Sequence, residues 1–229
     1  MSEPTPAPPA RRTRIAAQDR RDLILAAAAR RFAEFGFEAT TVRQLADDVN
    51  ILSGSLYHHF ATKEDILDAI VRQPALDQRN RALRIAALPV DAETRAVTLL
   101  EADLVAFTER QEAYAIIFAE RKFFRRSDQF HFVTLARRDA FEAWRTILRD
   151  GAEAGQFRAD VDPYLTISTI MRMLNTGADW YRNEDGSPID VMKSYSLEEL
   201  GNFYKGFVLS SIRAPGRAGE PMPEAAPFD

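Results

Sequence analysis

The residues best suited to do chemistry in this sequence form a short run of small polar side chains, Ser53-Gly54-Ser55, preceded by Leu52. The serine hydroxyls can hydrogen-bond to base edges or phosphate oxygens, and glycine lets the backbone approach a sugar–phosphate wall. Leu52 can touch a thymine methyl group. A helix that enters the major groove, which is about 12 Å wide, needs small or hydrogen-bonding residues at its leading end. The run is therefore a candidate for reading double-stranded DNA.

Groups that suit contact with the DNA backbone lie on both sides of this run. Tyr57, His58 and Lys63 offer a hydroxyl, an imidazole and an ammonium to phosphate, and Thr41 and Arg43 can anchor the segment to the opposite strand. Tyr57 can alternatively pack beneath its own domain, and His58 can simply be solvated. The predicted DNA-binding set is Thr41, Arg43, Leu52, Ser53, Gly54, Ser55, Tyr57, His58 and Lys63.

The distribution of charge supports a small DNA-binding surface. The formal net charge is −4, yet residues 11–31 hold seven arginines against Asp19 and Asp22. A basic patch on an acidic chain fits a protein in which one small surface meets DNA and the rest does not. The arginines of residues 11–14 can either reach into the minor groove or serve as a solubilising tail, and both alternatives stay open.

Residues needed for other chemistries are missing from the sequence. The absence of cysteine excludes disulfides, thiolate catalysis and cysteine-based zinc sites, and it fits a reducing cytoplasm. The three histidines come from distant segments, and the chain has neither a glycine-rich phosphate loop nor a Ser-His-Asp pattern, so we expect no enzyme, metal site or cofactor. Without a signal peptide or an apolar run long enough to span a bilayer, we expect a soluble cytoplasmic protein with no membrane contact.

Three short helices are expected to position the candidate residues. Apolar spacing predicts a helix over 19–35, with Ile24, Ala28, Phe32 and Phe35 on one face. A second helix begins at Thr41, where the pattern of a capping box with Gln44 is present, and a third covers about 53–59. The last two have the proportions of a helix-turn-helix.

The rest of the chain also has helical periodicity. A capping pattern at 62–65 opens a fourth helix that is expected to end before Pro74, and further helices are expected near 92–109, 112–122, 128–154, 163–182 and 197–213. No segment alternates as a strand would. The predicted fold is all-α, with an N-terminal three-helix helix-turn-helix DNA-binding domain and a larger helical ligand-binding and dimerisation domain.

Proline marks the ends of the chain, because eight of the twelve prolines lie in two tails. Such segments bury too little apolar surface to order themselves. The predicted division is a disordered Pro/Arg-rich arm at 1–14, the DNA-binding domain at 15–62, a linking helix at 63–74, the ligand-binding and dimerisation domain at 75–214, and a disordered tail at 215–229.

Two runs resemble the signature of TetR-family repressors: Thr40-Thr41-Val42-Arg43-Gln44-Leu45-Ala46 and Gly54-Ser55-Leu56-Tyr57-His58-His59-Phe60-Ala61-Thr62-Lys63-Glu64. The likeness covers about residues 19–70 and implies a DNA-binding domain, a linking helix, a ligand-binding domain and a two-fold dimer. Residues 51–64 are also similar to actinobacterial regulators of steroid and acyl-CoA breakdown. Many family members have Ser-Lys where this chain has Leu52-Ser53, so the phosphate contact of that lysine is lost here.

The resemblance implies an apolar effector pocket among the aromatic residues of the larger half. The candidate ligand-binding residues are Phe123, Phe141, Trp144, Arg172, Asn175 and Trp180. Arg172 can meet the phosphate or carboxylate of a lipid-, steroid- or acyl-CoA-derived effector. The alternatives are an ordinary core for the aromatic residues and a pairing across a dimer interface for the polar ones.

The last two predicted helices are candidates for dimerisation, because their apolar residues spread over more than one face. Two such helices from each subunit would form an isologous four-helix interface, and the alternative is a wide core within one chain. The predicted interface residues are Ile167, Ile170, Leu174, Leu200, Tyr204, Phe207 and Val208.

The favoured function is a ligand-responsive repressor that binds a palindromic operator as a dimer and is released by a small apolar or acyl-CoA-like effector. The alternatives are a helical enzyme that carries a helix-turn-helix and a small-molecule-binding helical protein without specific DNA binding.

Overall fold

The computed structural model describes residues 17–179, 196–217 and 219–228. Within these ranges the chain is helical and contains no strand, which confirms the all-α prediction. The α-helices are α1 (Ala17–Phe35), α2 (Val42–Asp48), α3 (Ser53–Leu56), α4 (Lys63–Ala86), α5 (Ala92–Glu109), α6 (Gln111–Ala119), α7 (Arg121–Arg126), α8 (His131–Glu153), α9 (Pro163–Asp179) and α10 (Leu197–Ile212). Two 3₁₀ turns, η1 (Asp128–Phe130) and η2 (Pro215–Arg217), complete the described elements.

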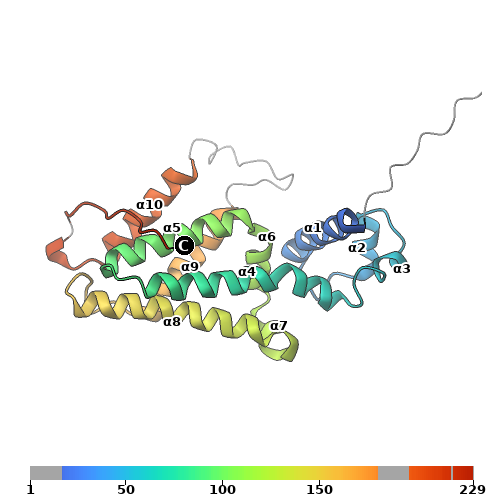
Figure 1. Cartoon of the computed structure of the whole chain (residues 1–229), viewed down its shortest axis with the longest axis horizontal. Coiled ribbons are helices and arrows are strands. Elements are labelled where there is room, and N and C mark those ends of the chain that lie inside the picture. Colours follow the sequence, from blue (N-terminus) through green and yellow to red (C-terminus); the bar gives the residue numbers. More distant parts are fainter. Residues whose placement is uncertain (1–16, 180–195, 218, 229) are drawn as a thin grey trace, which may run out of the picture.

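The helices form an elongated molecule with the N-terminal three at one end (Figure 1). Helix α4 runs from this end along the larger body, where α8 lies beside it for most of its length. Helix α5 packs against α4, α8, α9 and α10, so it lies at the centre of the larger domain. The short helices α6 and α7 lie where the two parts of the molecule meet.

The N-terminal domain has a small core that fixes α2 and α3 against α1. Ile24, Ala28 and Phe32 from α1 are buried together with Leu45 and Leu56. Phe35, which was expected on the same face of α1, is exposed, and Phe37 beyond the helix end is buried in its place. The Arg31 guanidinium donates two hydrogen bonds of 2.6 Å to the Asp48 carboxylate, which ties the end of α2 to α1.

Pro74 does not end the fourth helix, so the predicted break there is wrong. Helix α4 continues through Pro74 to Ala86. Proline lacks the amide that would bond to the preceding turn, and its ring crowds the carbonyl four residues earlier. Here the residue is buried, and its carbonyl accepts a 3.2 Å hydrogen bond from the Tyr114 hydroxyl of α6. Tertiary packing thus holds a helix that the local pattern would break.

The C-terminal tail packs against the larger domain, so the predicted disorder of 215–229 is wrong for the residues that the structure describes. The buried Arg213 guanidinium pairs with Glu93 and donates to the carbonyls of Glu220 and Pro221. The Ala226 amide donates to the Thr98 hydroxyl at 2.8 Å. The Arg213 guanidinium holds the two carbonyls in place, and Phe228 packs against the core. These contacts order the tail, and its composition does not predict them. The predicted arm at 1–14 lies outside the described residues.

Candidate functional site

The segment from α2 to α3 has the local geometry of a rigid helix-turn-helix. The Thr41 hydroxyl accepts from the Gln44 amide while the Gln44 side chain accepts from the Thr41 amide, so the predicted capping box is present. Asn50 adopts a φ of +53° in the turn, a left-handed conformation that asparagine tolerates better than most residues. Leu56 is buried beneath α3 and fixes the rotation of that helix.

The leading end of α3 is open to solvent. Leu52 is 83% exposed, Tyr57 is 53% exposed, and Gly54 and His58 are exposed as well. A Cβ added to Gly54 would meet no atom within 4 Å, and its φ is not in the left-handed range. Among the described residues, therefore, neither packing nor backbone strain requires glycine at this position, although glycine weakens a helix.

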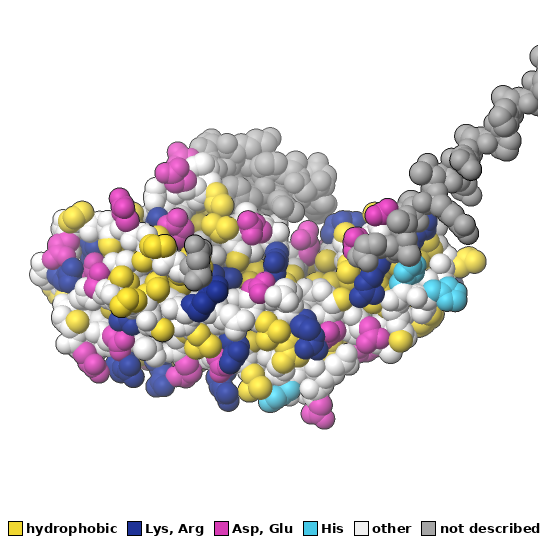
Figure 2. Space-filling view, viewed as in Figure 1, with side chains coloured by type: hydrophobic (Ala, Val, Ile, Leu, Met, Phe, Trp, Pro, Cys, Tyr) yellow, Lys and Arg dark blue, Asp and Glu magenta, His cyan; other side chains and the backbone are white. Residues whose placement is uncertain are grey.

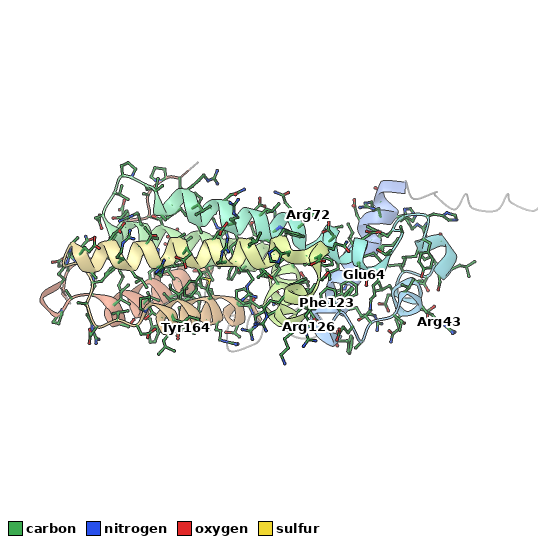
Figure 3. The ribbon with its side chains drawn as sticks, turned by 90° about the horizontal axis from the view of Figure 1, so that it is seen from below. Arg43, Glu64, Arg72, Phe123, Arg126 and Tyr164 are labelled. Carbon is green, nitrogen blue, oxygen red and sulfur yellow. The ribbon has the colours of Figure 1, made fainter. Side chains whose placement is uncertain are left out.

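Two of the predicted phosphate contacts differ in their surroundings. Arg43 is exposed at this end of the molecule, where Figure 3 shows it pointing outward, and it forms a solvated ion pair with Asp47 at 4.0 Å. Lys63, by contrast, turns inward: its ammonium donates to the carbonyls of Phe37 and Thr40 at 2.8 and 2.7 Å. Burial lowers the pKa of Lys63. The phosphate contact predicted for Lys63 is therefore corrected to a positioning role between α1, α2 and α4.

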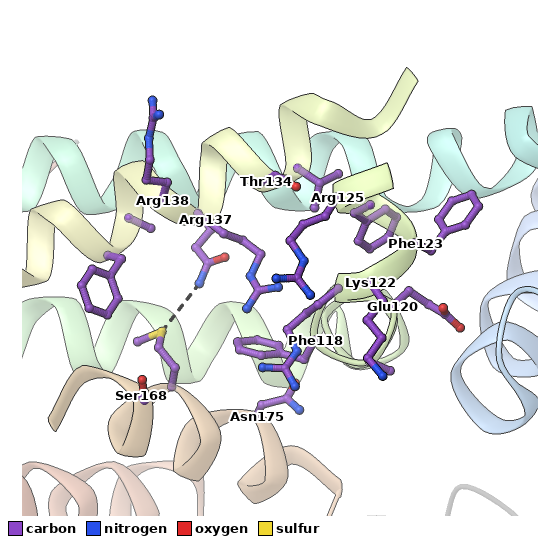
Figure 4. A pocket seen from close by; sticks show the side chains of 18 of the residues that line it. Phe118, Glu120, Lys122, Phe123, Arg125, Thr134, Arg137, Arg138, Ser168 and Asn175 are labelled. Carbon is purple, nitrogen blue, oxygen red and sulfur yellow. Dashed lines mark hydrogen bonds between the residues drawn. The ribbon is translucent and has the colours of Figure 1, made fainter. Parts of the chain in front are cut away.

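The larger domain contains a partly open cavity of about 990 Å³ between α4, α6, α7, α8 and α9 (Figure 4). Five of the six predicted ligand-binding residues line it, although they come from three segments of the chain: Phe123, Phe141, Trp144, Arg172 and Asn175. The sixth, Trp180, lies outside the described residues. Phe118, Val133 and Ile167 add to the apolar part of the lining.

One side of this cavity is strongly cationic, a feature that the sequence analysis missed. Its positive side chains are Arg121, Lys122, Arg125, Arg126, Arg137, Arg138 and Arg172, against two carboxylates, those of Glu38 and Glu120. Burial, together with repulsion from Arg121, Arg125 and Arg172, lowers the pKa of Arg137 to about 10. Figure 4 shows Arg125 and Arg137 extending into the same space from α7 and α8. Arg137 is half-buried and the other six cations are exposed. Such an excess of positive charge around one cavity favours a bound anion.

The cavity wall also touches the DNA-binding domain. The Glu120 carboxylate accepts a 2.8 Å hydrogen bond from the Phe37 amide, and the ring of Phe123 lies 4.8 Å from the ring of Phe37. Glu120 and Phe123 both line the cavity, at the side that faces α1 in Figure 4. Residues that can contact a ligand are therefore in direct contact with the turn between α1 and α2.

Most of the predicted dimer-interface residues are part of the chain's own core. The side chains of six of the seven are buried in the single chain, because α9 and α10 turn these faces toward α5 and its neighbours: Ile167, Ile170, Leu174, Leu200, Tyr204 and Val208. Such residues cannot meet a second chain without unpacking the first, so for them the alternative of an intrachain core is correct. Of the seven predicted residues, Phe207 alone is accessible to a second chain, because its side chain is 52% exposed.

A different apolar row lies on the outer face of α10. Phe203 is 64% exposed and its ring stacks 6.3 Å from that of Phe207, while Gly206 and Ser210 between and beyond them are also exposed. Leu165 is exposed on α9. Figure 2 shows hydrophobic side chains at the surface over this end of the molecule.

No three side chains of the described residues that could ligate a metal lie close enough together to hold an ion. Among the helices of residues 17–179 and 196–217, none is both long and apolar enough to cross a membrane.

Comparison with known proteins finds the same likeness at the level of families, sequences and structures. Residues 24–70 match bacterial regulatory proteins of the tetR family, and residues 89–196 match a tetracyclin repressor-like C-terminal domain. The chain is 34% identical over 216 residues to the HTH-type transcriptional repressor KstR2 of Mycolicibacterium smegmatis, covering 93% of this chain and 96% of that protein. It is 33% identical over 211 residues to KstR2 of Mycobacterium tuberculosis, covering 89% and 98%.

Two solved structures share the fold over nearly their whole length. The ketosteroid transcriptional regulator KstR2 of Mycobacterium tuberculosis superposes with a TM-score of 0.72 at 31% identity, covering 85% of this chain and 95% of that one. The probable transcriptional regulatory protein RHA5900 superposes with a TM-score of 0.73 at 31% identity, covering 85% and 100%.

Proposed function

The chain belongs to the TetR family of bacterial regulatory proteins and is a transcriptional repressor, and from this premise we propose that it binds an inverted-repeat operator as a homodimer in the cytoplasm. We further propose that an anionic, largely apolar effector of the acyl-CoA kind releases it from DNA. The relatives are named as transcriptional repressors, so neither an enzyme nor a protein without DNA activity describes the chain as well.

The open leading end of α3 is the observation that carries the DNA-binding proposal. Gly54 has no neighbour that a side chain would strike, so its small size is explained by a partner outside the chain. A duplex is such a partner, because a helix must come close to the phosphate walls to reach base edges. Leu52, Ser53 and Ser55 then face the bases, while Thr41, Arg43, Tyr57 and His58 contact the backbone.

The exposed row of α10 supports a two-fold dimer. Phe203 and Phe207 expose a large apolar area, and Gly206 lets a second helix approach closely between them. Pairing this row with its copy, and with Leu165 of α9, would build an isologous interface. Two α3 helices related by this axis would enter successive major grooves, so the operator is expected to be an inverted repeat.

The two sides of the cavity support the effector class. The apolar side suits an acyl or ring system, and the cationic side suits the phosphates of a coenzyme A thioester. The relative from Mycobacterium tuberculosis is called a ketosteroid regulator, which favours a steroid-derived acyl part for this chain as well.

Two connections can carry the effect of binding to the DNA-reading helices. Helix α4 is continuous from the DNA-binding domain into the cavity wall, and the contacts of Glu120 and Phe123 with Phe37 cross between the domains. An effector that shifts either one changes the spacing of the two α3 helices. The coupling must be reciprocal, so the operator weakens effector binding by the factor by which the effector weakens operator binding.

Fluorescence anisotropy with an inverted repeat taken from upstream of the gene tests the proposal. We expect sequence-preferring binding that weakens steeply with salt and is reversed by decanoyl-CoA but not by free CoA or decanoate. Arg137→Met should lower the affinity for decanoyl-CoA about tenfold, whereas Arg145→Met, outside the cavity on the same helix, should not. Binding to random DNA with equal affinity would contradict the DNA-binding part, and indifference to every CoA thioester would contradict the effector part.

A further inference from the structure

Trp144 places an unused hydrogen-bond donor in the wall of the cavity. The side chain, on α8, is 1% exposed and lines the cavity. Among the described residues, no acceptor lies within hydrogen-bonding distance of its buried indole nitrogen. The indole N–H can only donate, and buried donors without an acceptor are rare in folded proteins. A phenylalanine would supply a similar apolar surface without this penalty.

A second polar group faces the same cavity from α4. Gln78 is 4% exposed, and its amide nitrogen lies 3.9 Å from the Met171 sulfur, the contact drawn as a dashed line in Figure 4. A thioether is a weak acceptor, so this contact satisfies the amide poorly. The apolar part of the cavity therefore holds two polar groups whose hydrogen bonding is incomplete within the protein.

On α8, the cation Arg137 lies away from Trp144 along the helix axis. Arg137 precedes Trp144 on α8 by two helical turns, about 10 Å along the axis. An anionic head held by the arginines therefore leaves the body of the effector to reach Trp144. A carboxylate is not required there, because a neutral oxygen accepts from an indole N–H equally well.

We propose that the Trp144 indole N–H, assisted by the Gln78 amide, determines which effectors the cavity accepts, and that it selects molecules whose apolar part carries a neutral oxygen acceptor such as a ketone. This inference rests on the proposed function, in which the cavity is the effector site. A pure hydrocarbon body would fill the space but leave the donor unpaired. An oxygen in register with Trp144 would satisfy it, and a single buried hydrogen bond is worth about tenfold in affinity.

The test compares decanoyl-CoA with a set of mono-oxodecanoyl-CoA isomers that differ in the position of the ketone, using the full-length protein. We expect at least one isomer to bind about tenfold more tightly than decanoyl-CoA. Trp144→Phe should reduce the ratio of the affinity for that isomer to the affinity for decanoyl-CoA from about tenfold to about one. Gln78→Met should have the same direction of effect and a smaller size.

A spectroscopic readout keeps the test independent of how well the variants fold. The chain has two tryptophans, so protein labelled with indole-¹⁵N tryptophan gives two indole resonances, and Trp180→Phe assigns them. The Trp144 indole proton should move downfield with the preferred isomer and not with decanoyl-CoA.

The failures of the two proposals are distinguishable. If all isomers and decanoyl-CoA bind equally, release the operator equally and leave the indole proton in place, the inference is overturned while the proposed function stands. If no thioester binds at all, the inference falls together with the acyl-CoA effector.

Discussion

Replacing Gly54 by alanine should raise the stability of the protein and lower its affinity for operator DNA. The added Cβ meets no atom within 4 Å, so it introduces no clash in the free protein. Alanine loses less backbone entropy than glycine when a helix forms, so the free energy of unfolding should rise by about 0.5–1 kcal/mol. For a chain of this size that is an increase in melting temperature of about 1–4 °C.

On DNA the same methyl group lies between the helix and the groove wall. A lost or lengthened contact costs about 1 kcal/mol at each half-site, the lower end of the range for single contacts. Two half-sites in the proposed dimer give about 2 kcal/mol, or about thirtyfold in operator affinity. Gly54→Leu should abolish specific binding.

The assay is paired: thermal unfolding for stability, and fluorescence anisotropy on the operator for affinity. Gly216→Ala is the matched control, since a Cβ there also meets open space but η2 lies at the opposite end of the molecule from α3 (Figure 1). Its operator affinity should match that of the unmodified protein. A Gly54→Ala variant with unchanged operator affinity would refute the steric reasoning, whatever its melting temperature.

Three further perturbations test other parts of the molecule. Decanoyl-CoA lowers the operator affinity by a certain factor, and Glu120→Ala should reduce this factor about tenfold, because it removes a charge-assisted hydrogen bond to the DNA-binding domain. Glu120→Gln, which keeps an acceptor, should reduce the factor less. An unchanged factor in anisotropy titrations would argue against this connection. Phe207→Glu should weaken dimerisation at least thirtyfold in sedimentation equilibrium, whereas Leu135→Glu on α8 should not, and equal effects would contradict the assigned interface. Hydrogen bonds from Arg31 lower the pKa of Asp48, so their stabilisation is present above the ordinary pKa of an aspartate and is lost as the pH falls through the lowered value. Asp48→Asn should therefore cost about 0.5–1 kcal/mol in urea unfolding at pH 7, and this cost should shrink as the pH falls below the ordinary pKa of an aspartate.

Capping patterns and apolar periodicity predicted helices well where the interactions involved join residues that are close in the sequence. The capping boxes at Thr41 and Thr62 are present as expected, because a cap needs only residues three positions apart. The helix predicted over 92–109 has those same bounds as α5, since Asp91 caps it and its apolar face is regular. The predicted helix at 112–122 is instead divided between α6 and α7, with Glu120 between them.

The sequence could not reveal features that depend on how distant segments of the chain pack together. Apolar periodicity shows that Leu174 and Tyr204 need burial, but not that their own chain supplies it. The inward turn of Lys63 depends on carbonyls from a distant turn, so its side chain looked equally suited to phosphate. Arg121 and Arg137 looked like solvated charges on separate segments, and only the packing of α7 on α8 brings them to one cavity. The DNA contacts assigned to Arg43 and Tyr57 stay predictions.

The turn at Phe37 is where the cavity and the DNA-reading domain are joined most closely. Its amide is held by Glu120, its carbonyl accepts from Lys63 at the start of α4, and its ring packs on that of Phe123. Gly36 allows this arrangement by closing α1 with a φ of +87°, and a Cβ there would lie 3.3 Å from the Glu120 carboxylate. The covalent path along α4 and the path through the cavity wall therefore end on one residue. An anion that draws the arginines of α7 inward would pull on Glu120 and Phe123, and the turn that precedes the cap of α2 would have to follow.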